Sequence, residues 1–414
     1  MSTRGTNSTG KVDNRGMREI NRALLLDLIR RGGRISRTDL ARRSSLTKPT
    51  VSAIVDELLR DNVVREVGFD ESTAVGGRPA RLLEFNDDWA AYLAVHFGVR
   101  TTQVGVTDAR GVLKAVVKRP TVRGAPSRAI KVLGPMVDEV LAEARVPRSR
   151  LQVIGAAVPG PVNQRDGVCR VAPNLGWTDV PVREALSQSL GLPAVVYNIA
   201  QAAAVAEGRV GAARGVGSFL WLYVGTGVGS GIVIDGQLFF GARGLSGEIG
   251  HCSVSDEGEL CGCGQRGCLE TVASGPAIAR AAQAAVDRKQ TTRLKAVQGA
   301  IDAPAVVAAA RAGDTVAVEI LARAAGYLAK GVSYLVNILD PEIVVVGGGV
   351  VDAGDSLLEP LRVAFSKHAF LSREIPILSS SLGKHAELMG AALLAVEHTQ
   401  QDVRVVTRGA VKAI

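Results

Sequence analysis

Residues 250–270 read GHCSVSDEGELCGCGQRGCLE, which is the most distinctive stretch of the chain. Four of its side chains can bind soft or borderline metal ions, namely His251, Cys261, Cys263 and Cys268. Four such ligands within eighteen residues suit a tetrahedral zinc ion, and the intervening glycines let a short loop bring three thiolates together. Because all four ligands come from the protein, we expect a closed, structural zinc site.

Two other interpretations of these cysteines, a redox pair and unrelated buried thiols, are less favoured. Disulfides are rare in the cytosol, and scattered core cysteines would not cluster with glycines. Cys252 directly follows His251 but is not counted among the ligands. Cys169 stands alone in the sequence, and we expect it in the core.

Glu248 and Glu270 flank the predicted zinc ligands. Ionised carboxylates accept hydrogen bonds strongly, so two of them beside a fixed imidazole can hold the hydroxyl groups of a sugar. A salt bridge or a helix cap would use the same residue types, and the spacing alone does not decide between these roles.

Length and composition set the broad class. A chain of 414 residues is typical of two or three domains. Its 47% of hydrophobic residues can fill sizeable cores, and its 21% of charged residues excludes a largely disordered chain. Five cysteines in this length exclude a disulfide scaffold, and the polar, basic start MSTRGTNSTGKVDNRG is not a secretory signal.

Residues 215–234 form an uncharged stretch of twenty, long enough to cross a bilayer. Six of them are glycines, and the segment GTGVGSG lies between two runs of β-forming residues. Because each glycine in a helix costs ~1 kcal/mol relative to alanine, two strands joined by a glycine turn are favoured over a spanning helix. We therefore expect a cytoplasmic protein with no membrane partner.

The positive charge is concentrated near the N-terminus. Residues 1–48 contain twelve Lys and Arg against four Asp and Glu, a net charge of +8, while the whole chain carries +9. A basic segment on a nearly neutral body suggests an anionic partner, most simply nucleic acid, although a solvated basic tail would have the same composition.

The order of elements in this segment supports nucleic acid. Apolar periodicity predicts three helices, from about Met17 to Arg30, from Arg37 to about Arg43, and after Thr47. Ser36 and Thr47 are suitable N-caps for the second and third. Two β-prone runs follow, Val63–Val67 and Arg81–Phe85. Three helices and a ribbon predict a winged helix-turn-helix, with a basic dimerisation or packing module as the alternative.

In a winged helix-turn-helix the third helix enters the major groove, and its first residues meet base edges. Here these residues are small and polar with one cation: Thr47, Lys48, Thr50 and Ser52. The preceding helix carries cations expected at backbone phosphates: Arg37, Arg42 and Arg43. Arg78 is expected at the tip of the wing, near a minor groove. The predicted partner is double-stranded operator DNA.

From about Trp89 the chain alternates strand-like and helical segments rich in Ala, Val and Gly. Strands near 91–97, 102–107 and 112–117 are followed by a helix near 128–144 and a buried strand at 153–158. The order recurs with strands near 219–224, 231–234 and 237–240, then helices, then a strand at 343–346. This repetition predicts two α/β lobes of similar plan that face a shared cleft.

Nearly the whole chain resembles the ROK family, which groups sugar-responsive repressors with sugar kinases. The resemblance rests on the helix-turn-helix head and on five motifs: GGRP (76–79), VPGPV (158–162), GTGVGSGI (225–232), GEIGH (247–251) and CGCGQRGCLE (261–270). It implies an actin-like, ribonuclease H-type body of two lobes with a structural zinc on the His/Cys₃ site. It also implies sugar contacts at Gly160 (through its backbone), Asn198, Glu248, His251 and Glu270.

The expected fold class is therefore α/β, with an N-terminal winged helix-turn-helix followed by a two-lobe ROK body. We place the winged helix-turn-helix at residues 1–85 and the first α/β lobe at 86–197, joined by a C-terminal helix over 385–400. The second α/β lobe, with the zinc-binding loop, is placed at 198–384.

The chain departs from the pattern of ROK kinases at two places. The kinases carry a phosphate-binding DxGGT after the first body strand, where this chain has HFGVR at 96–100. They also carry an END-A-N segment whose Asp is the general base, where this chain has YNIAQ at 197–201. Isoleucine cannot accept a proton from a sugar hydroxyl, and phosphoryl transfer depends on positioned charge and a base or positioning group. We therefore predict no enzymatic activity.

The resulting prediction is a sugar-responsive transcriptional regulator, most simply a repressor, with zinc as its only cofactor. Two alternatives remain: a ROK sugar kinase with a DNA-binding head, and a regulator whose body binds a partner protein. Paired half-sites on DNA predict a homodimer, and a tetramer is equally allowed.

Overall fold

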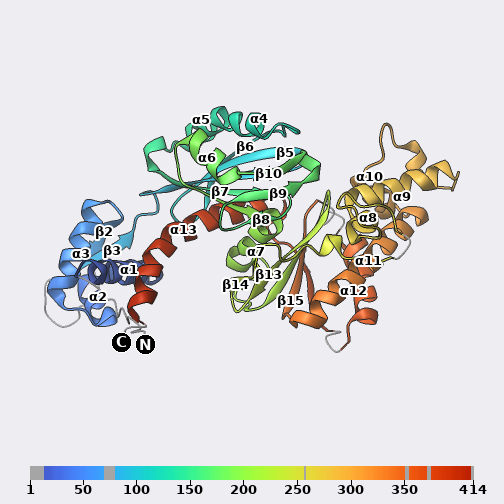
Figure 1. Ribbon diagram of the computed structural model, residues 1–414. Coiled ribbons are helices and arrows are strands. Elements are labelled where there is room, and N and C mark those ends of the chain that lie inside the picture. Colours follow the sequence, from blue (N-terminus) through green and yellow to red (C-terminus); the bar gives the residue numbers. More distant parts are fainter. Residues whose placement is uncertain (1–13, 70–79, 256–257, 350–353, 371–373, 412–414) are drawn as a thin grey trace, which may run out of the picture.

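The computed structural model describes residues 14–69, 80–255, 258–349, 354–370 and 374–411. The helix-turn-helix head lies at one end, the first lobe lies in the middle, and the second lobe lies at the other end (Figure 1). The last helix returns from the body to the head, where it packs beside the first helix. Within these described ranges, no helix combines the length and the apolar character needed to span a bilayer.

The head has the predicted order of three helices and a ribbon, but a short strand that was not predicted, β1 (Ile35–Ser36), makes the sheet three-stranded. Its helices are α1 (Asn14–Gly32), α2 (Arg37–Ser44) and α3 (Lys48–Arg60). Its sheet has the order β1 (Ile35–Ser36), β3 (Arg81–Phe85) and β2 (Val64–Phe69). Both predicted N-caps are confirmed, because Ser36 Oγ accepts from the Asp39 amide and Thr47 Oγ1 accepts from the Thr50 amide.

The first lobe is built on a five-stranded sheet in the order β11-β7-β4-β5-β6. Its strands are β4 (Ala91–Phe97), β5 (Thr101–Thr107), β6 (Leu113–Pro120), β7 (Leu151–Val158) and β11 (Ala194–Asn198). One face packs against α4 (Pro126–Lys131), α5 (Leu133–Ala144) and α6 (Val182–Leu190). Between β7 and α6 lies a small antiparallel sheet of β8 (Val162–Asn163), β9 (Val168–Ala172) and β10 (Trp177–Val180).

The prediction of one continuous helix over 128–144 is wrong, because the structure forms two helices, α4 and α5, that meet at Val132. Pro135 explains the break. Proline has no amide hydrogen to donate to the carbonyl four residues earlier, so it is tolerated in the first turn of α5 but not within a continuous helix.

The second lobe repeats the plan of the first. Its sheet has the order β14-β13-β12-β15-β16. The strands are β12 (Phe219–Val224), β13 (Val228–Ile234), β14 (Gln237–Leu238), β15 (Ile343–Gly347) and β16 (Ile377–Ser379). In both sheets the strands stand in the order third, second, first, fourth, fifth, with the same parallel and antiparallel pairings. The predicted repetition is therefore confirmed, and so is the hairpin of β12 and β13 around the glycine turn.

Helices of the second lobe form the outer end of the molecule (Figure 1). They are α8 (Leu269–Ala273), α9 (Gly275–Asp287), α10 (Ala303–Arg311), α11 (Thr315–Leu339) and α12 (Asp355–His368). Their apolar faces pack together with Leu220, Leu222 and Val346 of the sheet in one large cluster.

The helix that follows the last strand of each lobe packs against the sheet of the other lobe. Helix α7 (Ile199–Val210) follows β11 of the first lobe, but Ala200 and Ala204 pack against the sheet of the second. Helix α13 (Ala386–Val411) follows the second lobe, but it packs on β4 and β7 of the first. The two helices cross closely, because a Cβ at Gly390 would overlap the backbone of Ala202.

The head is fixed to the first lobe rather than joined by a free linker. Leu25 and Ile29 of α1 pack in one cluster with Tyr92, Val153 and Ala395 of the body. The linker that follows β3 is also held at both ends.

On the head side, the Asn86 amide donates to the Val63 carbonyl at 3.0 Å. On the lobe side, the Asp87 carbonyl accepts from the Ala109 amide at 2.9 Å, and its carboxylate pairs with Arg110 at 2.6 Å. Head and first lobe therefore form one packed unit.

Candidate metal centre, sugar site and DNA interface

The predicted zinc ligands come from three short elements of the second lobe. His251 ends the 3₁₀ turn η3 (Ile249–His251), and Cys268 is the N-cap residue of α8. Cys261 and Cys263 lie in a tight turn, in which the Cys261 carbonyl accepts from the Gly264 amide at 2.9 Å. An isolated bridge between Ser253 and Cys268 folds the loop back on itself.

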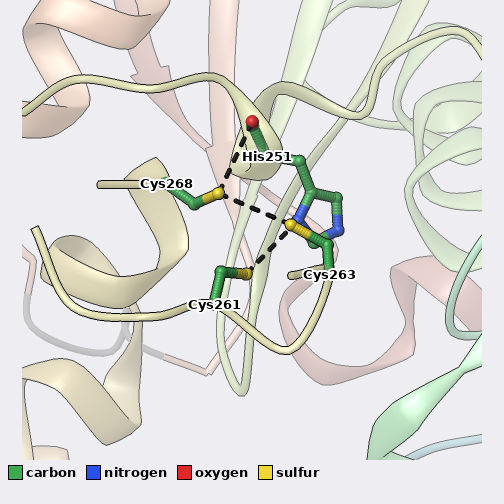
Figure 2. Close-up of side chains that lie close together, drawn as sticks. All are labelled: His251, Cys261, Cys263 and Cys268. Atoms are coloured by element: carbon green, nitrogen blue, oxygen red, sulfur yellow. Dashed lines mark hydrogen bonds between the residues drawn. The ribbon is translucent and has the colours of Figure 1, made fainter. Parts of the chain in front are cut away.

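The side chains of the four ligands converge (Figure 2). Their ligand atoms all lie within 4.8 Å of one another. Cys263 Sγ is 3.6 Å from Cys268 Sγ, and Cys261 Sγ is 3.6 Å from His251 Nδ1. A tetrahedral ion with Zn–S bonds of ~2.3 Å places its sulfur ligands ~3.8 Å apart, so this cluster fits zinc.

The remaining cysteines behave as the sequence predicts. Cys252 is exposed and does not belong to the cluster. Cys169 is buried in the core of the first lobe, and that burial raises the pKa of its thiol to about 12. It is therefore an inert core residue.

Glu248 and Glu270 approach opposite nitrogens of the His251 ring. Glu248 Oε2 lies 3.9 Å from Nε2, and Glu270 Oε1 lies 3.8 Å from Nδ1. Glu270 Oε1 also accepts a hydrogen bond from the Cys261 thiol at 3.2 Å. Burial raises the pKa of the Glu248 carboxyl, while His251 opposes this rise and Glu270 adds to it. Thus Nδ1 faces the thiols, and Nε2 remains on the side of Glu248.

Asn198 links the end of β11 to the start of α7. Its Oδ1 accepts from the Ala200 amide at 2.7 Å and so caps the helix. Its Nδ2 donates to the Gly160 carbonyl at 2.8 Å. One amide hydrogen and one oxygen lone pair of Asn198 are left for a ligand.

Strand β13 contacts elements that carry both groups of candidate sugar-binding residues. On one side, Gly231 of β13 is so close to Ala200 that a Cβ there would overlap the Ala200 carbonyl. On the other side, the amide and hydroxyl of Ser230 donate to the Gly247 carbonyl at 2.8 Å and 3.0 Å. Gly247 directly precedes Glu248, so both groups lie on elements packed around one strand.

His96 and Ile199 occupy the positions at which the sequence departs from the kinase pattern. His96 Nδ1 lies 3.4 Å from Gln103 Nε2, and burial lowers the pKa of the ring to about 4, so the ring is neutral near pH 7. Ile199 packs in an apolar cluster with Ala157 and Leu388. Ile199 has no group that accepts a proton, and His96 has no carboxylate at the position where the kinase pattern has Asp.

The predicted base-reading residues lie at the start of α3. Thr47 and Lys48 are exposed, Thr50 and Ser52 are half-buried, and the hydroxyls of Thr47 and Thr50 share a hydrogen bond of 2.8 Å. Arg42 and Arg43 are exposed on α2, where Arg42 pairs with Asp39 at 2.5 Å. Arg78 lies outside the described residues.

Arg37 has a different environment from the other two α2 cations. Its guanidinium pairs with Asp56 of α3 at 2.8 Å and approaches Glu66 of β2 at 3.8 Å. Glu66 also pairs with Arg81 of β3. Arg37 therefore links α2 to the recognition helix and to the base of the wing.

Sequence reasoning did not find a set of contacts between the lobes. Gln201 Oε1 accepts from Gln164 Nε2 at 3.3 Å, and Gln201 Nε2 donates to the Gly244 carbonyl at 3.5 Å. The rings of Tyr197 and Phe240 lie 6.0 Å apart. Tyr197 and Gln201 belong to the YNIAQ segment that was singled out, but their partners are distant in sequence and no spacing identifies them.

A winged helix-turn-helix on a duplicated, actin-like α/β body with a Cys₃His cluster defines a DNA-binding relative of the two-lobe sugar kinases. The chain belongs to the ROK family, whose model matches residues 92–398. A second model, described as a winged helix-turn-helix DNA-binding domain, matches residues 17–65.

Relatives of two kinds are similar to this chain. The xylose repressor of Caldicellulosiruptor bescii is 30% identical over 385 residues, covering 92% of this chain and 96% of that protein. The glucokinase of Halalkalibacterium halodurans is 34% identical, covering 75% of this chain and 95% of that protein. The repressor thus matches head and body, whereas the glucokinase matches a smaller share of the chain.

Solved structures give the same division. A ROK family transcriptional regulator, described as a homolog of the E. coli MLC protein, has a TM-score of 0.80 at 26% identity, covering 96% of this chain and 100% of that one. A Streptomyces griseus ROK glucokinase in complex with glucose and AMPPNP has a TM-score of 0.65 at 33% identity, covering 74% and 100%. The predicted class, a ROK transcriptional regulator, is confirmed.

Proposed function

We propose that this protein is a repressor that binds operator DNA through its head and a sugar between the lobes of its body, without phosphorylating that sugar. One observation carries the proposal. A DNA-reading head is packed onto a ROK body in which the candidate sugar-binding groups are present, while neutral His96 and Ile199 stand where the kinases have charge and a base. The full-length match to a xylose repressor supports the same assignment.

The proposed sugar contacts are Asn198 and the Gly160 backbone from the first lobe, with Glu248, His251 and Glu270 from the second. Carboxylate oxygens accept from sugar hydroxyls, and the remaining amide hydrogen of Asn198 donates to a sugar oxygen. Because relatives that cover head and body are named xylose repressors, D-xylose is the first ligand to test.

A zinc ion on His251, Cys261, Cys263 and Cys268 supports this site. When bound, zinc supplies a structural cross-link and holds the three cysteines as thiolates. Glu270 Oε1, which accepts a hydrogen bond from Cys261 Sγ at 3.2 Å when that thiol is protonated, is then available to a sugar hydroxyl. With Nδ1 of His251 facing the metal, Nε2 carries the hydrogen and donates beside Glu248.

The DNA contacts of the proposal are Thr47, Lys48, Thr50 and Ser52 at base edges and Arg42 and Arg43 at phosphates. Arg78 of the wing stays a prediction, because it lies outside the described residues. Paired half-sites require two heads, so we expect at least a homodimer that acts in the cytoplasm.

The test is operator binding by the full chain, because the head shares its core with the first lobe. An operator is first selected from a random duplex library, and its affinity is then measured with and without D-xylose and a panel of other sugars. We expect a sugar to change operator affinity in the wild type and in the exposed control Glu319→Gln, but not in Glu248→Gln. Failure to select any DNA, or an unchanged affinity with every sugar, would refute the proposal.

A further inference from the structure

One loop of the second lobe, residues 239–247, joins the two lobes directly beside the proposed sugar site; we call it the strap. Both of its ends are fixed to β13. The Phe239 amide donates to the Ile232 carbonyl at 2.8 Å, and the Gly247 carbonyl accepts from the Ser230 amide at 2.8 Å. Glu248 follows the strap immediately, so movement of the strap is felt at the first residue of the sugar site.

The middle of the strap is pressed against the first lobe. Gly244 is its one buried residue. A Cβ at Gly244 would lie 2.6 Å from the Val162 carbonyl, and its φ of +75° is one that residues with a side chain rarely adopt. The hydrogen bond from Gln201 Nε2 to the Gly244 carbonyl extends this contact into α7. A second hydrogen bond, from Gln164 Nε2 to Gln201 Oε1, extends it to the loop after β8.

The strap also reaches the cluster that anchors the head. Phe240 of the strap packs against Tyr197 of β11, with ring centroids 6.0 Å apart. Tyr197 in turn packs against the cluster that contains Leu25 and Ile29 of α1 together with Ala395 of α13. Burial raises the pKa of Tyr197 to about 12, so this contact stays uncharged at every physiological pH.

We propose that the strap is the element through which a bound sugar changes the affinity of the head for operator DNA. This inference rests on the function proposed above and names its regulation. A sugar that contacts both Glu248 and Asn198 holds the second lobe, which carries the strap, against the first lobe. It therefore favours the contact of the strap with the first lobe. The contact changes how Tyr197 packs, and packed clusters shift between discrete arrangements rather than deforming continuously. The arrangement of α1 on α13 therefore follows occupancy of the sugar site.

The test uses the full-length protein, its selected operator and D-xylose as the probe. The measured quantity is the coupling factor, the ratio of operator Kd values with and without saturating D-xylose, expected at ~5–150 in the wild type. Phe240→Ala and Tyr197→Ala should each bring this factor close to 1 without greatly changing the sugar-free operator Kd. The double variant should lose no more coupling than either single variant, because both remove the same contact.

Phe239→Ala is the matched control, since Phe239 is 44% exposed and directly precedes Phe240. It should keep the wild-type coupling factor. Gly244→Ala is a second, independent variant, because its Cβ forces the strap away from Val162. It should weaken D-xylose binding, measured by calorimetry, and lower the coupling factor as well.

The outcomes separate the two proposals. A wild-type coupling factor that survives in Phe240→Ala, Tyr197→Ala and Gly244→Ala overturns the strap while leaving the proposed function intact. An equal loss of the coupling factor in Phe239→Ala also overturns the strap proposal, because the specific contact of Phe240 with Tyr197 would then be irrelevant. A wild type that binds operator but whose affinity no sugar changes overturns the proposed function, and the strap inference fails with it.

Discussion

At the scale of single residues, His251 connects two sites through its two ring nitrogens. Nδ1 lies 3.6 Å from Cys261 Sγ, and Nε2 lies 3.9 Å from Glu248. An imidazole held by a metal has a fixed orientation and a fixed tautomer, which makes it a better hydrogen-bond donor to a ligand. Damage to the metal cluster should therefore appear at the sugar site as well.

Cys263→Ser tests this connection. We expect zinc content to fall from about one per chain, and the melting temperature to fall by ~5–10 °C for a loss of about 2–3 kcal/mol. Sugar affinity should fall too, because His251 is no longer fixed. Cys252→Ser, at an exposed position outside the cluster, should change none of these quantities. Metal analysis that finds no zinc in wild type purified without chelators would contradict the assignment.

A second residue-scale prediction concerns Glu387, which is buried at the start of α13. Burial, together with the nearby carboxylate of Glu207, raises the pKa of Glu387 to about 7, against the opposing effect of a backbone hydrogen bond. The folded state then holds a proton between pH 4.5 and pH 7 that the unfolded state releases. Stability therefore falls as pH rises through this window, by up to about 3 kcal/mol.

Glu387→Gln keeps the shape of the side chain without its charge. We expect the variant to melt at a higher temperature than the wild type at pH 8, and this gain to shrink toward zero near pH 5. The comparison is two melting curves at each pH, with exposed Glu319→Gln as the control. A gain of equal size at both pH values would show that ionisation of Glu387 is not the cause.

At the scale of elements, the head depends on how α2, α3 and the wing are held together. The guanidinium of Arg37 is already paired with Asp56 and near Glu66. The pair of Arg42 with Asp39 is an exposed one that costs little to break, because the Arg42 side chain is 73% exposed. The two arginines should therefore respond differently to DNA.

Salt dependence distinguishes them. Arg42→Ala should weaken binding to all DNA sequences alike and reduce the slope of log K against log salt by ~1, as loss of one phosphate contact does. Arg37→Ala should leave the slope unchanged and instead reduce discrimination between operators, since α3 and the wing lose their common link. A reduced slope in Arg37→Ala would show instead that Arg37 contacts a DNA phosphate, as the sequence predicts.

Prediction from sequence succeeded where the deciding interactions are local. The caps Ser36 and Thr47 bond to amides three residues away, and the Cys₃His cluster is closed by one loop, so short spacing was enough to find them. The range predicted for the second lobe, 198–384, already contained α7, but the residues against which this helix packs were not predictable in this way. An apolar stripe shows that a helix is buried, but not that Ala200 and Ala204 pack on the other lobe's sheet.

The same limit applies to the charged and aromatic residues of the candidate sites. A cation on α2 has the same sequence signature whether it meets a DNA phosphate or, as Arg37 does, a carboxylate of the same chain. The partner of Tyr197 is Phe240, which lies in the other lobe and becomes a neighbour only when the lobes pack. Long-range pairing of this kind follows from the tertiary fold, not from periodicity.

At the scale of the whole molecule, the retained fold of the sugar kinases does not imply their activity. With neutral His96 and apolar Ile199 in the key positions, we expect no sugar-dependent production of ADP from ATP and magnesium. A panel of hexoses, pentoses and amino sugars in a coupled assay checks this, with a ROK glucokinase as the positive control. Turnover at ~1 per second or faster would establish a kinase.

The final prediction concerns reciprocity between the two ends of the molecule. Head and first lobe form one packed unit, so a sugar that changes operator affinity must do so through a shared equilibrium of the whole chain. Linkage then requires the operator to change sugar affinity by the same factor, ~5–150. We expect D-xylose to bind the free protein more tightly than the protein–operator complex, as for an inducer that releases DNA. A corepressor would instead bind the protein–operator complex more tightly than the free protein.

Calorimetric titration of D-xylose into the protein, alone and saturated with operator, measures this factor independently of DNA-binding assays. Glu319→Gln should reproduce the wild-type factor, because that carboxylate is exposed on α11. Glu248→Gln should bind sugar weakly in both states. Because linkage holds at any equilibrium, equal sugar affinities with and without operator, in a protein whose operator affinity does respond to D-xylose, would show that the titrated site is not coupled to DNA and that the sugar acts from a second site.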